Sequence, residues 1–322
     1  MRLKLVPEGT SFDFFKRAKL WLGISALMMV VGFASFLLQG LNFGIDFRGG
    51  TTIRTEAAEA VDVGAYRDAI APLDLGDVSI TEVFDPTFEE DQHVAMIRIQ
   101  AQEDGEAISG EMIETLKTSL DAAAPGIKFV SVESVGPKVS GELITTAVIA
   151  VALAIAAVLV YIWLRFEWQF ALGAVAALVH DVVLTIGVFS ELQIKFDLAI
   201  IAALLTIVGY SLNDTVVVFD RVRENLRRYK KKDLAEVLNI SINETLSRTV
   251  MTSVTTLLAL ISLYVLGGDV IRGFVFAMIW GVLVGTYSSV FVASTILLKL
   301  GVKRDWSKQA NTTGNQFSNI DA

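Results

Sequence analysis

The hydrophobic residues of the chain fall into six long runs that polar stretches separate. A helix that crosses the hydrocarbon core of a bilayer needs about 20 mainly apolar residues, and each run is close to that length. The pattern therefore predicts a polytopic α-helical membrane protein with six transmembrane helices. The predicted spans are residues 20–38, 143–164, 168–190, 198–219, 249–266 and 273–298.

In the long polar stretch after the first run, residues 40–142, the apolar segments are short and alternate with polar residues, as in a soluble domain. Its apolar patterns and turn residues predict the order β-α-β-β-α-β, with Asp62 and Ser109 as the residues that cap the two helices. That order is the signature of a small α+β ferredoxin-like domain. The predicted strands are 51–55, 78–84, 93–100 and 129–135, and the predicted helices are 63–73 and 110–124.

Positive charges are distributed unevenly between the two sides of this predicted topology. Of the 27 Lys and Arg residues, 18 lie before the first span, between spans two and three, between spans four and five, or after span six. Because cytoplasmic loops carry the excess of Lys and Arg, both termini are predicted to be cytoplasmic and the domain periplasmic. The resulting division is a cytoplasmic segment 1–19, an uncleaved anchor 20–38, the periplasmic domain 40–142, a membrane remainder 143–300 with a basic cytoplasmic loop 220–248, and a cytoplasmic tail 301–322.

Composition narrows the chemistry that the chain can perform. It has no cysteine, which excludes disulfides, thiolate catalysis and cysteine-ligated metals. A net charge of −8 argues against a nucleic-acid partner. No phosphate-binding loop, zinc-protease motif or dinucleotide fingerprint is present. We therefore expect neither an enzyme nor a cofactor, and an ion gradient remains as the available source of energy.

Ionisable residues inside the spans need an explanation because they are costly in a bilayer. The third span carries His180 and Asp181, and the fourth carries Asn213 and Asp214. We place Asp214 about 9 Å from the predicted end of its span, where the long side chain of Arg248 could reach it. The pair is either a proton relay or a buried interaction that only holds helices together. His180 and Asp181 point about 100° apart along the helix, so we expect them, like Asn213, to give support at most and not to share a partner.

Several motifs resemble the SecD/SecF family of protein-export membrane subunits, which is related to the RND transporters. They are FGIDFRGG at 43–50, VGPKVSG at 135–141, VHD at 179–181, GYSLNDTVVVFDR at 209–221 and LSRT at 246–249. The resemblance implies half of an RND-type bundle, in an accessory subunit of the Sec translocase that uses the proton-motive force to promote preprotein export. It also implies the partners SecD, YajC and SecYEG, and proton-pathway roles for Asp214 and Arg248.

Two other functions stay open on the sequence. The chain could be a scaffold that assembles the translocon without transducing energy. The chain could also be a proton-coupled efflux half-transporter. The single small domain disfavours this function, because about 100 residues make a minimal domain without room for a drug-binding region.

Overall fold

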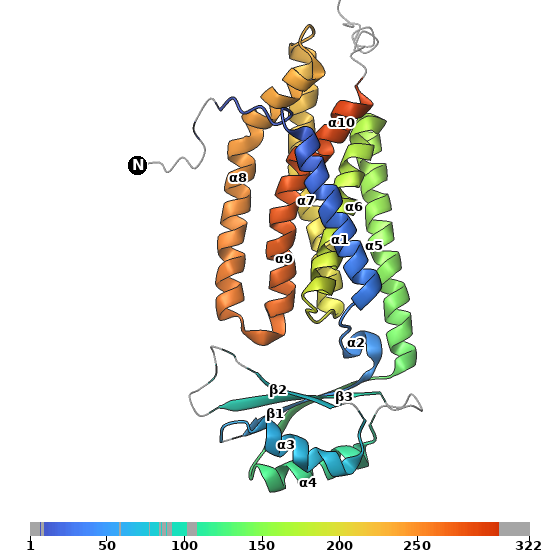
Figure 1. The fold of residues 1–322 in the computed structure, drawn as a ribbon, viewed down its shortest axis with the longest axis vertical. Coiled ribbons are helices and arrows are strands. Elements are labelled where there is room, and N and C mark those ends of the chain that lie inside the picture. Colours follow the sequence, from blue (N-terminus) through green and yellow to red (C-terminus); the bar gives the residue numbers. More distant parts are fainter. Residues whose placement is uncertain are drawn as a thin grey trace, which may run out of the picture.

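The computed structural model describes residues 7, 10–57, 59–76, 78–83, 85, 88, 92–101 and 108–302. A long helical bundle stands on a small α+β domain (Figure 1). Within the described residues, six helices are long and apolar enough to cross a membrane, which confirms the predicted number of spans. Beyond residue 302, the predicted tail lies outside the described part. The bundle consists of α1 (Ala18–Gln39), α5 (Pro137–Arg165), α6 (Trp168–Glu191), α7 (Leu198–Arg228), α8 (Leu234–Leu266), α9 (Gly268–Ser288), a π-helical turn (Ser289–Ala293) and α10 (Ser294–Leu300).

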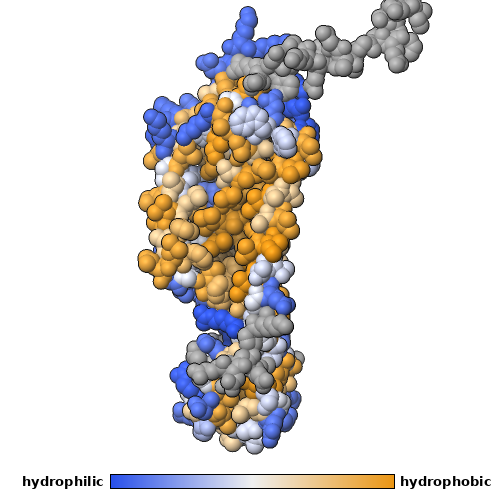
Figure 2. All heavy atoms as spheres, turned by 90° about the vertical axis from the view of Figure 1, so that its right-hand side faces the viewer, coloured by the Kyte–Doolittle hydropathy of each residue, from blue (hydrophilic) through white to orange (hydrophobic). Residues whose placement is uncertain are grey.

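The surface of the bundle is apolar over most of its length. Figure 2 shows a broad hydrophobic band with hydrophilic residues at both ends. Helices α1, α5 and α8 carry much of this band, with exposed side chains such as Leu38, Val148 and Leu258, whereas α6, α7 and α9 are far more buried. An exposed apolar belt of this extent is what lipid tails cover.

Small residues let the central helices approach closely. A Cβ atom on Gly187 of α6 would lie 2.7 Å from the Cα atom of Gly32 on α1, so the two backbones meet at glycines. On α9, Gly281 and Gly285 face Ile207 and Ser211 of α7. Small residues four apart on a membrane helix typically allow such contacts.

The prediction of a loop over 220–248 is wrong. Helix α7 continues to Arg228 and α8 begins at Leu234, so only residues 229–233 connect them. The two extensions bury an apolar face between them, which includes Val222, Leu226 and Leu238. Charged residues end the hydrophobic run here, but they lie on the outer face of helices that continue. The hairpin projects past the other helices (Figure 1).

The small domain has the predicted ferredoxin-like topology. Its sheet has the order β2-β3-β1-β4, and every neighbouring pair is antiparallel. Asp62 and Ser109 accept hydrogen bonds from the backbone at the starts of the two helices, as predicted. The elements are β1 (Gly50–Ala57), α3 (Val63–Ile70) with a 3₁₀ turn (Ala71–Leu73), β2 (Val78–Val83), β3 (His93–Gln100), α4 (Gly110–Ala123) and β4 (Lys128–Val135).

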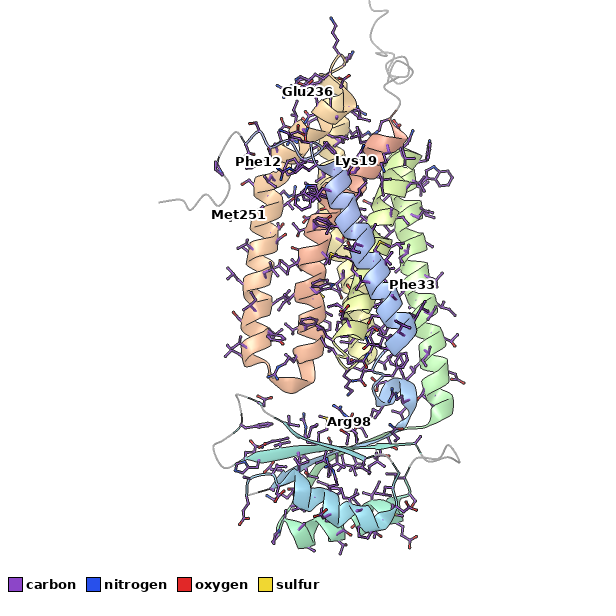
Figure 3. The ribbon with its side chains drawn as sticks, viewed as in Figure 1. Phe12, Lys19, Phe33, Arg98, Glu236 and Met251 are labelled. Carbon is purple, nitrogen blue, oxygen red and sulfur yellow. The ribbon has the colours of Figure 1, made fainter. Side chains whose placement is uncertain are left out.

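The two faces of this sheet have different surroundings. One face packs on α3 and α4 through a core that includes Ile53, Ile97 and Leu116. The opposite face looks toward the end of the bundle (Figure 1) and carries polar and charged side chains, Arg98 among them (Figure 3). The chain therefore places a polar gap between the domain and the membrane helices.

Candidate functional site

A fully buried polar cluster of the bundle is centred on Asp181 of α6. Its Oδ2 atom accepts hydrogen bonds from Ser211 Oγ on α7 at 2.6 Å and from Ser288 Oγ on α9 at 2.8 Å. Its Oδ1 atom lies 2.9 Å from Nδ1 of His180, which must be the donor if the carboxylate is ionised. Asp181, His180, Ser211 and Ser288 are all at least 98% buried. One carboxylate thus ties three helices together.

His180 and Asp181 have different partners on the other helices, Tyr287 for His180 and Ser211 and Ser288 for Asp181, but the sequence analysis did not anticipate that the two would contact each other. The 100° separation holds for the Cα–Cβ bonds of adjacent helical residues, but both side chains are long enough to turn toward each other. They interact directly, and both contribute to a single network.

A second set of contacts extends this network toward α1. The ring of Tyr287 on α9 stacks on His180, with 6.1 Å between centroids. The Tyr287 hydroxyl lies 2.8 Å from Ser25 Oγ and donates to the Trp21 carbonyl, also at 2.8 Å. Nε2 of His180 is buried without a hydrogen-bond partner among the described residues. The polar network therefore spans α1, α6, α7 and α9.

Asp214 is buried like Asp181 but differs from it in hydrogen bonding. It lies three residues after Ser211 on α7 and is 3% exposed, yet its Oδ2 atom has no hydrogen-bond partner among the described residues. Most buried carboxylate oxygens have a donor, so Asp214 is a buried acid with an unused acceptor.

Arg248 on α8 is the cation that acts electrostatically on Asp214. Within the part of the chain that the structure describes, no ion pair or hydrogen bond joins the two side chains, and Arg248 is exposed. The next residue, Thr249, is buried and its hydroxyl also has no partner. The structure therefore brings the two predicted relay residues into electrostatic range without contact.

Two other acidic or amide residues of α7 lie outside the cluster. Asn213 is exposed, so it does not support Asp214 as the sequence suggested. Asp220 is exposed as well and lies 3.5 Å from Arg165, in keeping with its place near the end of the predicted span.

The sequence analysis missed Ser211, Tyr287 and Ser288. Ser211 lies one helical turn before Asp214, and Ser288 follows Gly281 and Gly285 at helical spacing, so both spacings were readable. Serine is common at helix contacts in membranes, however, and only the structure shows that these two hydroxyls meet one carboxylate. The π-helical turn that starts at residue 289 directly follows Ser288, and such turns are frequent at functional sites.

Comparisons with known proteins agree with this architecture. Residues 115–303 match the model of the C-terminal part of the protein export membrane proteins SecD/SecF, and residues 34–61 match the SecD/SecF GG motif. The chain is 62% identical to the protein translocase subunit SecF of Cereibacter sphaeroides, over 100% of this chain and 99% of the relative. It is 60% identical to the SecF subunit of Rhodobacter capsulatus, over 99% and 97% of the two chains.

A solved structure shows the same fold. The crystal structure of SecDF, a translocon-associated membrane protein from Thermus thermophilus, is 35% identical, with a TM-score of 0.79 over 91% of this chain. The match covers 39% of the SecDF chain. This chain therefore corresponds to about two fifths of that longer protein.

Proposed function

The chain belongs to the SecD/SecF family of protein-export membrane proteins and takes part in Sec-dependent protein translocation, and we propose that it moves protons through its bundle to drive preprotein export. The observation that carries this proposal is the Oδ2 atom of buried Asp214, which has no hydrogen-bond partner in the described part of the chain. An acid that can gain or lose a proton without breaking existing hydrogen bonds at that atom is suited to a relay. One charge that moves through 100 mV releases about 2.3 kcal/mol.

The other polar residues have distinct parts in this proposal. Arg248 stabilises the ionised form of Asp214 when it approaches and stabilises that form less when it withdraws. Asp181 accepts three hydrogen bonds, so its role is to position α7 and α9 around Asp214. His180 orients Asp181 and does not itself carry the proton.

The partners follow from the family and from the size of the chain. It is a multi-pass protein of the bacterial inner membrane, with both termini in the cytoplasm and the ferredoxin-like domain in the periplasm in our proposal. SecD supplies the other half of an RND-type bundle, and SecYEG and YajC complete the translocase. The exposed side chain of Asn213 favours a protein partner on this face of α7, because an exposed amide within a span is costly in lipid.

The test is an export assay on Asp214→Asn in the full translocase. This change keeps the size of the side chain and removes its charge. We expect complex formation with SecD to be normal and the export that depends on proton-motive force to be lost. Asp220→Asn is the matched control, since it makes the same change on an exposed position of the same helix.

The result also separates this proposal from a scaffold role. A scaffold needs an intact bundle but no titrating acid, so it predicts that Asp214→Asn leaves export unchanged. Normal export by Asp214→Asn, at wild-type levels of the complex, contradicts proton transfer through this residue.

A further inference from the structure

A small pocket lies where the bundle meets the sheet. Its volume is about 240 Å³, and its walls come from the segment after α1, the end of β3 and the connection between α6 and α7. Two backbone hydrogen bonds of 2.8 Å hold this connection against the segment after α1, from Gly44 N to Phe196 O and from Phe196 N to Asn42 O. Ser79 of β2 also lines it, so the pocket is built from four separate parts of the chain.

The glycines of the FGIDFRGG motif shape this pocket. Gly44 leaves room for the stem of Lys195, because a Cβ atom at Gly44 would lie 2.8 Å from Lys195 Cε. Gly50 has a φ of +125°, and a Cβ atom there would lie 2.4 Å from the carbonyl oxygen of Ile99. Only glycine fits this conformation and this approach to β3. The motif thus places its own Arg48 beside β3 and the α6–α7 connection.

The charged residues that line the pocket are all basic. They are Arg48, Arg98 and Lys195, and no carboxylate lines it among the residues the structure describes. Arg98 points from β3 toward the bundle (Figure 3). Among the described residues, its buried Nε atom has no hydrogen-bond partner, and its Nη2 atom donates only to Met96 Sδ, a weak acceptor, at 3.0 Å. None of the three cations forms an ion pair within 4 Å with a described residue.

The neighbouring carboxylates of Asp46 and Asp197 form hydrogen bonds with the backbone. Asp46 accepts from the backbone N–H of Leu198, and Asp197 accepts from that of Ile200, so both cap the start of α7. Burial and the nearby charge of Arg98 lower the pKa of the Lys195 amine, and the charges of Asp197, Asp46 and Glu133 offset part of this effect. Two cations are thus held together, partly buried, and neither forms an ion pair within 4 Å with a described residue.

We propose that this basic pocket binds a phosphate-type oxyanion, either the phosphate of a lipid headgroup or free phosphate. The planar guanidinium of Arg98 can present two N–H groups to one oxyanion, and Lys195 adds a point charge. The pocket is several times larger than the ~30 Å³ that a water molecule occupies. Phe43, Phe47 and Phe196 cluster beside it at the ends of α6 and α7, as aromatic residues do at the level of lipid headgroups.

The experiment uses the purified full-length chain with Arg98→Gln and Lys195→Gln. Arg67→Gln is the control, because it removes one positive charge from an exposed position of α3. One arm measures retention of phosphatidylglycerol over phosphatidylcholine after reconstitution in vesicles that contain both. The other arm measures the rise of the melting temperature on addition of inorganic phosphate.

We expect each pocket variant to weaken binding about tenfold, or about 1.4 kcal/mol, and the control to bind as wild type does. Preference for phosphatidylglycerol that the variants lose identifies a lipid headgroup. Stabilisation by phosphate alone, lost in the variants, identifies a soluble oxyanion. Arg98→Lys keeps the charge and should retain part of the binding, which guards against a folding defect. If wild type and pocket variants behave alike in both arms, the pocket does not bind an oxyanion.

Discussion

Truncation of the two buried aspartates of the bundle should destabilise it to different extents, although they lie on neighbouring helices. Asp181→Ala and Asp214→Ala delete the same atoms from positions that are 1% and 3% exposed. The cost of the cavity is therefore similar in both variants. What differs is the hydrogen bonding, because Asp181 accepts three bonds and the Oδ2 atom of Asp214 accepts none from a described residue.

The magnitude follows from these contacts. Side-chain hydrogen bonds in membrane proteins contribute about 0.6 kcal/mol on average and about 1.7 kcal/mol at most. Loss of the three bonds to Asp181 therefore destabilises the bundle by about 2 kcal/mol more than the loss of Asp214. That difference corresponds to about a thirtyfold change in the folding equilibrium. Removal of Asp214 also relieves the cost of an unpartnered buried acceptor.

Unfolding of the full chain in mixed micelles measures this difference. Circular dichroism follows the loss of helix as denaturing detergent replaces the mild one, and the two midpoints are compared with wild type. Ser211→Ala, which removes one donor, should lose part of what Asp181→Ala loses. Equal destabilisation by Asp181→Ala and Asp214→Ala would refute the assignment of Asp181 as the structural acid and Asp214 as the free one.

Three further changes test other parts of the structure. Gly187→Ala adds a Cβ atom 2.7 Å from the α1 backbone and should cost about 1–3 kcal/mol in the same unfolding assay; Gly209→Ala, with nothing within 4 Å, should not. Asn243→Ala removes one hydrogen bond from and one to the backbone of Phe12, so amide exchange near Phe12 should accelerate, and unchanged exchange contradicts this anchor. Burial raises the pKa of Asp197 above 3.8, so its contribution to stability is full below pH 3.8 and is lost as the pH rises through the folded pKa. Asp197→Asn should flatten that part of a plot of melting temperature against pH, and an unaltered slope contradicts it.

The spans could be predicted from the sequence because hydrophobic length is a local property. Each predicted span lies within one observed helix or, for the last, within α9, the π-helical turn and α10. The ends were less predictable. Helix α7 runs nine residues past the predicted end at 219, because Val222 and Leu226 bury against α8 while the charged residues between them face outward. A hydropathy window averages these two faces and cannot see the continuation.

The small domain was predictable for a related reason. Strand alternation, the two capping residues and the order of elements are all local signals, and they were enough to fix the β-α-β-β-α-β topology. The relation of the domain to the bundle was not. Arg98 and Lys195 are almost 100 residues apart in the chain, and no local pattern indicates that they line one pocket.

Within the site, the sequence found the acids but not their partners. A charged residue in an apolar run is conspicuous, so Asp181 and Asp214 could be singled out. Which of the two is satisfied depends on Ser211 and Ser288, which come from two other helices. That distinction decides which acid keeps an acceptor oxygen without a partner among the described residues, and it requires the tertiary structure.

The hairpin of α7 and α8 accounts for the relation between Asp214 and Arg248. Asp214 lies 14 residues before the end of α7 and Arg248 lies 14 residues after the start of α8, so each is about 21 Å from the connecting turn. The predicted 9 Å is a different distance, because it was counted to the end of the apolar run and α7 continues past that point. Because these two distances are equal, Asp214 and Arg248 lie at the same height along the hairpin. Their height does not determine which way each side chain points. Arg248 faces outward while Thr249, about 100° further round α8, is buried. Contact between Asp214 and Arg248 therefore depends on the rotation of α8 about its own axis, and α8 is among the least buried helices of the bundle.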